Sequence, residues 1–480
     1  MAEKVLEIWS RISVRHWFRT EKILFLLLVF LIPFQQRFYK FLQIISVSLV
    51  NPNWHVPEYF EVHLDAFISD FVIIALIFWC LKKGMIQWRS YFWEKERKYL
   101  SLFLLFSLAS ILNSDFAAYP LPYWRWMHLA LPAFLFFFLS RTNLEEGGFK
   151  KLAKIVLAIA LMECAIAIVQ YFIQHSLGLK VLGEPTLIAR HYIGSNFPMA
   201  DGSIWIFDRF FHVVREKAFV LRAAGTLPHP NVLGGFMVFG LLMTYYLYGL
   251  GKKRGWLAVA ILIQTFCLFI TYSRSAVYAA GFATLLWIVF TSWREKKFHS
   301  LFWVSAGSFL VCLTLLYPQL FERGGIVSYT GVTQRSDALR LTVHDVGLAM
   351  VRAHPFLGVG FNNYMLVFKA FTQGQALPAT YIHNVYLHLG VEVGVFGLLS
   401  FLAFCLLVLI KGWKNRQRPE ILTSLCIFVG ILAIGLVDFY PLCVQQIRLI
   451  FFLVAGLLVC PRNLKSQVPP SGTTTQSSAI

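Results

Sequence analysis

The stretch that decides the fold begins Arg335-Ser-Asp-Ala-Leu-Arg340, passes through His354-Pro-Phe-Leu-Gly-Val-Gly360 and ends in His383-Asn-Val-Tyr-Leu387. It is polar and carries arginines, and it leads directly into an apolar run over 384–410 that is long enough to cross a bilayer. His383 stands at the junction between the two. The pattern predicts arginines and a histidine held at a membrane surface, as chemistry on a lipid-linked phosphate requires.

Composition indicates an integral membrane protein, because 58% of the 480 residues are hydrophobic. At roughly 20 residues per crossing, about twelve apolar runs are long enough, or nearly long enough, to span a bilayer. We therefore expect an all-α, polytopic protein of about 12 transmembrane helices. The predicted spans are 22–36, 66–81, 99–114, 121–140, 152–175, 231–250, 255–272, 275–292, 299–317, 384–410, 421–437 and 444–460.

The distribution of charge predicts the orientation of the chain. The formal net charge is +19, and most of the lysines and arginines fall in cytoplasmic segments if the N-terminus is inside. An even number of spans then leaves both termini in the cytoplasm. The first apolar run lacks a small-residue cleavage site, so it is expected to be a retained anchor. Because the basic residues are scattered over short loops, the sequence argues against nucleic-acid binding.

The eight cysteines fit the same setting. Seven lie in or at the ends of the predicted spans, and Cys443 falls in a short outer turn. No CxxC motif or paired framework occurs in the outer loops. We interpret the cysteines as small apolar fillers, and we expect neither disulfides nor a metal site.

Three regions are expected along the chain. Residues 1–21 form a cytoplasmic leader, 22–460 a transmembrane domain, and 461–480 a tail whose Ser, Thr and Pro predict disorder. Two long outer segments interrupt the regular pattern, 174–230 and 318–382. Segments of this length are usually functional.

The second outer segment contains an expected amphipathic helix over 336–352. Its apolar face is formed by residues at helical spacing, namely Leu339, Val343, Val346 and Met350. On another face Asp337, Arg340 and His344 fall at i, i+3 and i+7, so their side chains are predicted neighbours. Pro355 is expected to end the helix.

Arg274 stands in Thr271-Tyr-Ser-Arg274-Ser275, a turn of a few residues between two predicted spans. One interpretation is an interfacial arginine that reaches lipid headgroups. However, a basic residue in a short outer loop opposes the positive-inside bias, and an anionic ligand would compensate for it. The turn therefore predicts an anion-binding arginine.

Three further arginines have the same alternatives. Arg335 and Arg340 lie just before or on the predicted loop helix, and the simple interpretation is a solvated face paired with Asp337. The functional interpretation is that their guanidinium groups hold a phosphate or pyrophosphate through paired hydrogen bonds. Arg222, which precedes the turn-rich Gly225-Thr-Leu-Pro-His-Pro-Asn231, is a candidate of the same kind.

His383 is the candidate general base, since an imidazole titrates near neutral pH and can accept a proton from a sugar hydroxyl. The alternative is a structural histidine that makes hydrogen bonds at a helix start. Asn384 is expected either to orient His383 or to cap the helix that follows.

Glu392 is expected to bond neighbouring backbone or an arginine where helices approach closely. Glu163, in the middle of a predicted span, is expected to be functional, protonated or paired inside the bundle.

These motifs together resemble the O-antigen ligase and Wzy-type polysaccharide polymerase superfamily. The matching elements are Arg222 with Gly225–Asn231, Ser273-Arg274-Ser275, Arg340-Leu-Thr-Val-His344, His354–Gly360, and His383–Leu387 with Glu392-Val-Gly394. One departure is His344, where that family often has an aromatic residue. This departure concerns the packing of the loop helix and not the role that the resemblance implies for Arg340.

The resemblance implies a membrane glycosyltransferase of the GT-C type in the bacterial inner membrane. It implies transfer of a glycan from undecaprenyl pyrophosphate to an acceptor hydroxyl on the periplasmic face, without metal or cofactor. The acceptor is a lipid A–core sugar in ligases and another lipid-linked repeat unit in polymerases, and the residues do not separate the two. A small-anion transporter is a further alternative, although no internal repeat is evident.

The resemblance also implies roles for individual residues. Arg274 and Arg340 would bind the pyrophosphate and stabilise the leaving group, with Arg335 and Arg222 as further pyrophosphate-binding residues. His383 would act as the base or position the acceptor. Asn384 and Glu392 would support the site.

Overall fold

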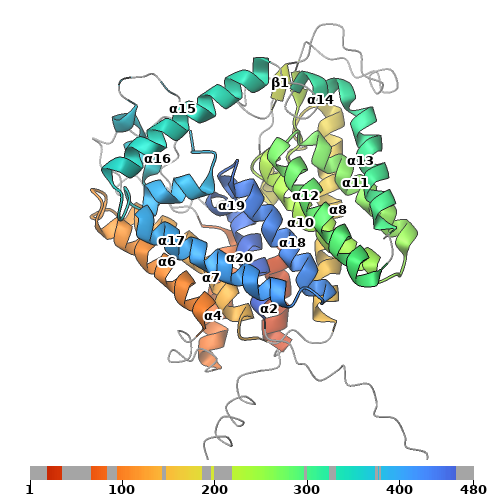
Figure 1. The fold of residues 1–480 in the computed structure, drawn as a ribbon, viewed down its shortest axis with the longest axis horizontal. Helices are drawn as coiled ribbons and strands as arrows, with labels where there is room; N and C mark the ends of the chain where they lie inside the picture. Colours follow the sequence, from red (N-terminus) through yellow and green to blue (C-terminus); the bar gives the residue numbers. More distant parts are fainter. Residues whose placement is uncertain are drawn as a thin grey trace, which may run out of the picture.

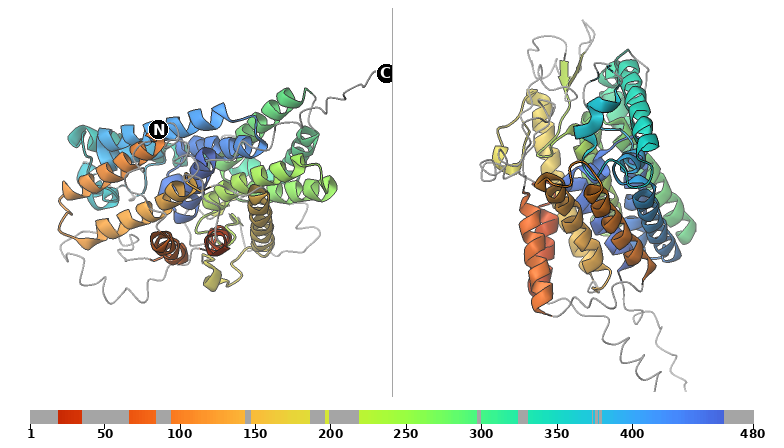
Figure 2. Two further views of the ribbon diagram at one scale, coloured as in Figure 1. Left: turned by 90° about the horizontal axis from the view of Figure 1, so that it is seen from below. Right: turned by 90° about the vertical axis from the view of Figure 1, so that its left-hand side faces the viewer.

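The fold is a bundle of long helices that run roughly side by side (Figure 1; Figure 2). The computed structural model describes residues 19–34, 66–83, 94–142, 147–185, 196–198, 219–296, 300–323, 331–372, 374, 377 and 380–460. The expected tail over 461–480, and most of the expected leader over 1–21, therefore lie outside the described residues.

Twelve long helices make up the described part of the bundle. They are α2 (Arg19–Phe30), α4 (Ile68–Lys82), α6 (Lys95–Leu112), α7 (Pro120–Leu139), α8 (Gly148–Ile173), α10 (Pro230–Gly249), α11 (Arg254–Ile270), α12 (Arg274–Glu295), α13 (Leu301–Leu315), α17 (Val385–Lys414), α18 (Pro419–Gly435) and α20 (Gln445–Val459). Each overlaps one of the predicted spans.

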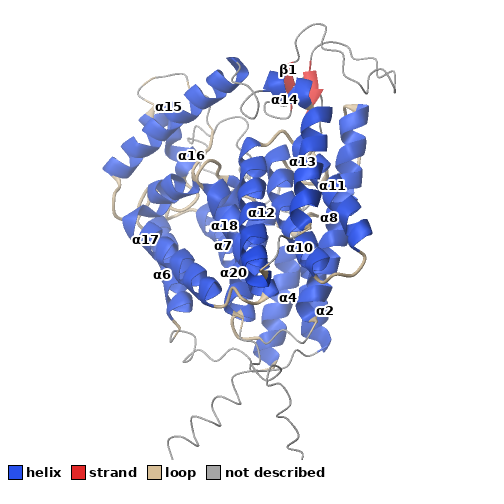
Figure 3. Ribbon diagram, turned by 45° about the vertical axis from the view of Figure 1, so that its right-hand side comes forward, coloured by secondary structure: helices blue, strands red, loops and turns tan. Residues whose placement is uncertain are grey.

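The remaining elements fall between the long helices in sequence, and α15 extends over one end of the bundle (Figure 1; Figure 3). They are η2 (Lys180–Leu182), β1 (Asn196–Pro198), β2 (Phe219–Leu221), α14 (Tyr317–Arg323), α15 (Gly331–Ala353), α16 (Tyr364–Val367), η3 (Phe368–Phe371) and α19 (Tyr440–Cys443). The two strands pair antiparallel, with Asn196 opposite Leu221.

The structure is that of an all-α membrane protein. In the described part of the chain, α8, α10, α12 and α17 are long and apolar enough to cross a membrane by length and composition. Four shorter apolar helices, α11, α13, α18 and α20, accompany them. The count of about 12 crossings stays a prediction.

Helix α10 is the centre of the bundle. It is apolar on all sides, as a fully buried helix must be, and it packs against α8, α11, α12, α18 and α20. Glycines allow the close approach, because a Cβ at Gly234 would lie 2.6 Å from Ala276 Cβ and one at Gly240 would lie 2.9 Å from Ala160 Cβ. The core therefore fixes the N-terminus of α10, where the Gly225–Asn231 motif ends.

The predicted loop helix over 336–352 is confirmed as part of α15. Its expected apolar face is buried: Val343 and Met350 are fully enclosed, and they pack with Ile382 and Val391 in a second hydrophobic cluster. This cluster joins α15 to the start of α17. The helix thus holds its polar face in a fixed position at the end of the bundle.

The turn after α15 packs backbone to backbone against a break in α17. The amides of Val359 and Gly360 donate hydrogen bonds to the carbonyls of Val391 and Glu392, at 2.9 and 3.1 Å. Gly394 interrupts α17 with φ +64°, and a Cβ there would lie 2.2 Å from the Phe356 carbonyl oxygen. The glycines of the His354–Gly360 and Glu392-Val-Gly394 motifs therefore allow close contact between the two backbones.

Gly394→Ala is expected to destabilise the protein, because it combines a left-handed backbone with a steric clash. The strained backbone alone costs about 1–3 kcal/mol, and the clash adds to it. Thermal denaturation of the purified protein in detergent measures the loss. Gly281→Ala in α12 is the matched control, since a Cβ added at Gly281 would have no atom within 4 Å. Equal melting temperatures for the two variants would contradict this account.

Candidate functional site

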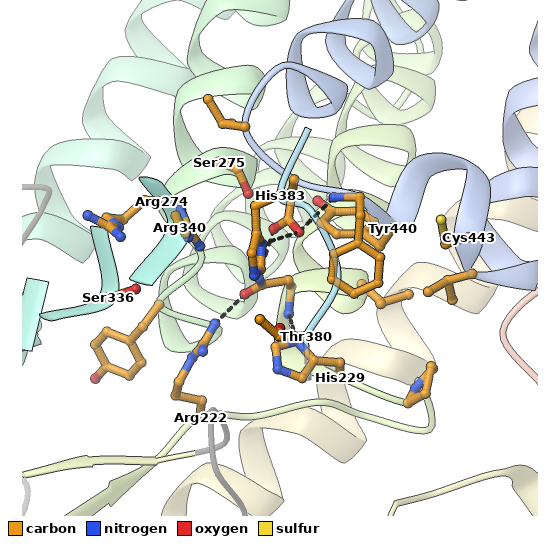
Figure 4. Close-up of a pocket in the computed structure, with 18 of the residues that line it drawn as sticks. Arg222, His229, Arg274, Ser275, Ser336, Arg340, Thr380, His383, Tyr440 and Cys443 are labelled. Atoms are coloured by element: carbon orange, nitrogen blue, oxygen red, sulfur yellow. Dashed lines mark hydrogen bonds and ion pairs between the residues drawn. The ribbon is translucent and has the colours of Figure 1, made fainter. Parts of the chain in front are cut away.

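A cavity of about 670 Å³ lies at the α15 end of the bundle (Figure 4). Segments far apart in sequence form its wall: the link from β2 to α10, the start of α12, α14, α15, the residues before α17, and the link from α18 to α20. Apart from Cys443 and the tyrosines Tyr272, Tyr278 and Tyr440, the polar and charged side chains among the lining residues are Arg222, His229, Asn231, Arg274, Ser275, Arg323, Ser336, Asp337, Arg340, Thr380, His383, Asp438, Gln445 and Gln446.

A chain of hydrogen bonds crosses the cavity wall (Figure 4). The Arg222 guanidinium donates to the side-chain oxygen of Asn231. The side-chain amide of Asn231 in turn donates to Asp438 Oδ2 at 2.9 Å, and Asp438 Oδ1 lies 3.2 Å from His383 Nδ1. Because a carboxylate only accepts, Nδ1 carries the proton of this bond, and Nε2 is the ring nitrogen left for a ligand.

Asp438 is an ionised, buried carboxylate. Its side chain is 1% exposed. Burial raises its pKa, but the hydrogen bond from His383, the charges of His383 and Arg340 and the amide of Phe439 together hold the pKa below its ordinary value. The carboxylate is therefore charged at neutral pH, and it can stabilise a positive charge on His383.

The cavity carries more positive than negative charge. Four arginines line it, but among the described lining residues only Asp337 and Asp438 are acidic. Burial lowers the pKa values of Arg222, Arg323 and Arg340, and the charges of neighbouring arginines lower each of them further. Such mutual repulsion would be relieved by an anion.

Arg274 and Arg340 differ in their partners. Arg274 forms an ion pair with Asp337, with Nη2 2.9 Å from Oδ1. Asp337 was the neighbour expected for Arg340, three residues along the same helix. Within the described residues, the Arg340 guanidinium instead has no hydrogen-bond or ion-pair partner. Arg340 is therefore the arginine most available to a ligand.

His229 is a structural histidine at the start of α10. Its Nδ1 accepts a hydrogen bond from the backbone amide of Asn231 at 3.1 Å, which caps the helix. Burial, together with the nearby charge of Arg222, lowers its pKa to about 3. His229 is thus neutral near pH 7 and holds Asn231 in place.

Most of the residues singled out from sequence meet in the cavity. Arg222, Arg274, Arg340 and His383 all line it. Arg335 lies in the first turns of α15, and its side chain is outside the described part of the structure.

The two supporting residues lie around the cavity rather than in its lining. Asn384 caps α17, accepting hydrogen bonds from the amides of Tyr386 and Leu387, both at 2.9 Å. It also donates to the Leu436 carbonyl at 3.0 Å, which ties His383 to the end of α18.

Glu392 is buried one turn beyond His388, with Oε1 3.4 Å from His388 Nε2. Glu392 therefore belongs to the packing of α17 against the turn after α15.

Glu163 is paired inside the bundle, which is one of the three alternatives expected for it. Its carboxylate accepts from the Thr226 amide at 2.8 Å and from the Thr226 hydroxyl at 2.6 Å. Two turns along α8, Gln170 donates to the Gly225 carbonyl at 2.8 Å. Together they hold the turn that places Arg222 and Asn231.

Sequence reasoning missed Asp438, Arg323 and Gln446. Asp438 had a usable signal: it is the last acidic residue of the chain after Glu420, and it follows a predicted span directly. Arg323 and Gln446 had no comparable signal, since each sits among residues that fit an ordinary helix end. Among the described residues, no three His, Cys, Asp or Glu side chains cluster as a metal site requires.

Comparison with known proteins matches a segment that contributes part of this site. An O-antigen ligase domain matches residues 257–402. An O-antigen ligase of Pseudomonas aeruginosa strain PAO1 is 30% identical over 156 residues, which are 32% of this chain and 35% of that protein. The matched part thus spans about a third of the relative's length. The domain match includes Arg274, Arg340 and His383, and both matches support the resemblance to the O-antigen ligase and Wzy-type polymerase superfamily that the motifs predicted.

Proposed function

We propose that this protein is a membrane glycosyltransferase of the GT-C type that works as an O-antigen ligase. It moves a glycan from undecaprenyl pyrophosphate to a sugar hydroxyl, such as one of the lipid A–core, on the periplasmic face of the inner membrane. The observation that carries the proposal is the surplus of arginines beside the His383–Asp438 pair in one cavity. The domain match over residues 257–402 supports the same class of reaction.

The arginines supply the pyrophosphate site in this proposal. Arg340, which lacks a protein partner within the described residues, binds a phosphate oxygen directly. Arg274, held by Asp337, binds a second, and Arg222 adds positive charge in the same cavity. Arg335, in the first turns of α15, is a further pyrophosphate-binding residue of the proposal. Negative charge grows on the pyrophosphate as its bond to the sugar breaks, and preorganised guanidinium groups stabilise that charge in a largely enclosed site. The arginines thereby take the role that a metal ion has in other phosphate chemistry, and no cofactor is needed.

His383 activates the acceptor. Nε2 removes the proton of the acceptor hydroxyl while the hydroxyl oxygen bonds to the anomeric carbon of the donor sugar. The bond from that carbon to the pyrophosphate oxygen breaks, and undecaprenyl pyrophosphate leaves with the electron pair. Asp438, 3.2 Å from Nδ1, stabilises the imidazolium that forms.

A polymerase of the same superfamily is the second candidate, because the same site would serve a lipid-linked repeat unit as acceptor. Deletion of the gene separates the two. A ligase predicts loss of all ligated glycan together with accumulation of full-length lipid-linked chains. A single repeat unit left on the core would instead identify a polymerase.

Arg340→Ala is expected to lower transfer by about 10²–10³-fold, the usual effect of removing one preorganised group that stabilises transition-state charge. The assay is transfer from purified undecaprenyl-pyrophosphate-linked glycan to lipid A–core, with the product resolved on a gel. Arg294→Ala is the matched control, since Arg294 lies in the last turn of α12 and bonds the Gln417 carbonyl and Glu295. Full activity in Arg340→Ala would contradict the proposed pyrophosphate site.

Chelation by EDTA is expected to leave transfer unchanged, because arginines provide the positive charge. The same assay, run with and without EDTA on the wild-type protein, measures it. Loss of activity that returns on addition of a divalent cation would overturn the metal-independent reaction.

Asp438→Asn is expected to lower kcat by about 10²-fold or more, because it removes the charge that stabilises the His383 imidazolium. The KM of the donor should change little, since the arginines remain. A loss confined to donor KM, with kcat retained, would show that Asp438 acts on the arginine cluster and not through His383.

A further inference from the structure

The two sides of His383 in the cavity differ in chemistry. Arg274 and Arg340 lie on one side of His383, and Cys443 lies on the opposite side (Figure 4). The residues that follow Cys443 in sequence, Val444, Gln445 and Gln446 at the start of α20, also line the cavity. One side therefore carries cationic side chains and the other carries neutral amides.

Gln446 is a buried amide that has no hydrogen-bond partner among the described residues. It is 4% exposed and lines the cavity, and in the described structure its side chain makes no hydrogen bond. Buried amides are normally hydrogen-bonded. An unpartnered amide that faces a cavity is therefore placed to bond a molecule inside it.

The adjacent Gln445 has the opposite character. Its amide nitrogen donates to Ser69 Oγ at 3.2 Å and to Asp70 Oδ1 at 3.1 Å, and its oxygen accepts from Arg448 at 3.4 Å. Arg448 also bonds the carbonyls of Leu442 and His128. Gln445 thus joins α20 to α4, and Gln446 is left for the cavity.

Aromatic rings also line the cavity that Gln446 faces. Phe67 lines the same cavity and packs edge-on against His128 at 5.1 Å between ring centroids. Phe439 stacks on Tyr381 at 4.6 Å and meets His383 edge-on at 5.4 Å. A sugar presents hydroxyls, which bond both groups of an amide, and apolar C–H faces, which pack on aromatic rings.

We propose that Gln446 binds the acceptor sugar and that the α20 side of the cavity is the acceptor subsite. This inference rests on the proposed function. Displacement at the anomeric carbon requires the acceptor hydroxyl to arrive opposite the leaving pyrophosphate. With the pyrophosphate on Arg274 and Arg340, the acceptor reaches His383 from the side of Cys443 and Gln446. Gln446 is then a positioning residue that holds the acceptor for His383.

Gln446→Met, which keeps the size of the side chain and removes its hydrogen bonds, is the test. The KM for lipid A–core is expected to rise about tenfold, as for the loss of one or two hydrogen bonds to neutral groups. The KM for undecaprenyl-pyrophosphate-linked glycan and the melting temperature should not change. Gln445→Met is the matched control, and it should lower the melting temperature because it breaks the network to Ser69, Asp70 and Arg448.

Two results would overturn the acceptor subsite while the wild-type enzyme remains active. A rise in donor KM with acceptor KM unchanged would assign Gln446 to the donor sugar. A fall in the melting temperature of Gln446→Met equal to that of Gln445→Met would assign it to packing. If the wild-type protein forms no product with this donor and acceptor, the proposed function fails and the subsite falls with it.

Discussion

The buried carboxylate of Asp438 is the interaction on which the cavity depends. It lies in the short link between α18 and α19, yet it bonds Asn231 at the start of α10 and His383 before α17. Asn231 in turn accepts from Arg222. A charged group enclosed to this degree is stable only when it is fully bonded. The folding of three separate helix ends thereby fixes the orientation of a single imidazole.

Packing elsewhere in the chain supports this constraint. The glycines of α10 let neighbouring helices close around it, and Glu163 and Gln170 hold the turn that precedes it. On the other side of the cavity, the apolar face of α15 and the Gly394 break in α17 hold Arg340 and Asp337 in the cavity wall. Packing residues that take no direct part in the proposed reaction thus set the spacing between the arginines and His383.

Much of this arrangement was predictable from sequence. Hydrophobic period and length placed a helix over every predicted span, and helical spacing predicted the loop helix with its buried face. Arg222, Arg274, Arg340 and His383 were expected at one site and all line one cavity. The pairing was not predictable, because Asp337 bonds Arg274 from another helix and not Arg340 from its own. Local spacing carries no information on contacts across 63 residues of chain, and for the same reason Asp438 was missed as the partner of His383.

The central claim is that the arginine side of the cavity holds the pyrophosphate of a lipid-linked donor next to His383. A cryo-electron microscopy structure of the protein with undecaprenyl pyrophosphate bound tests it most directly. The account predicts that the phosphate oxygens lie within hydrogen-bond distance of Arg274 and Arg340, with His383 Nε2 facing the position of the transferred sugar. Phosphates bound away from both arginines, with this cavity empty, would contradict it.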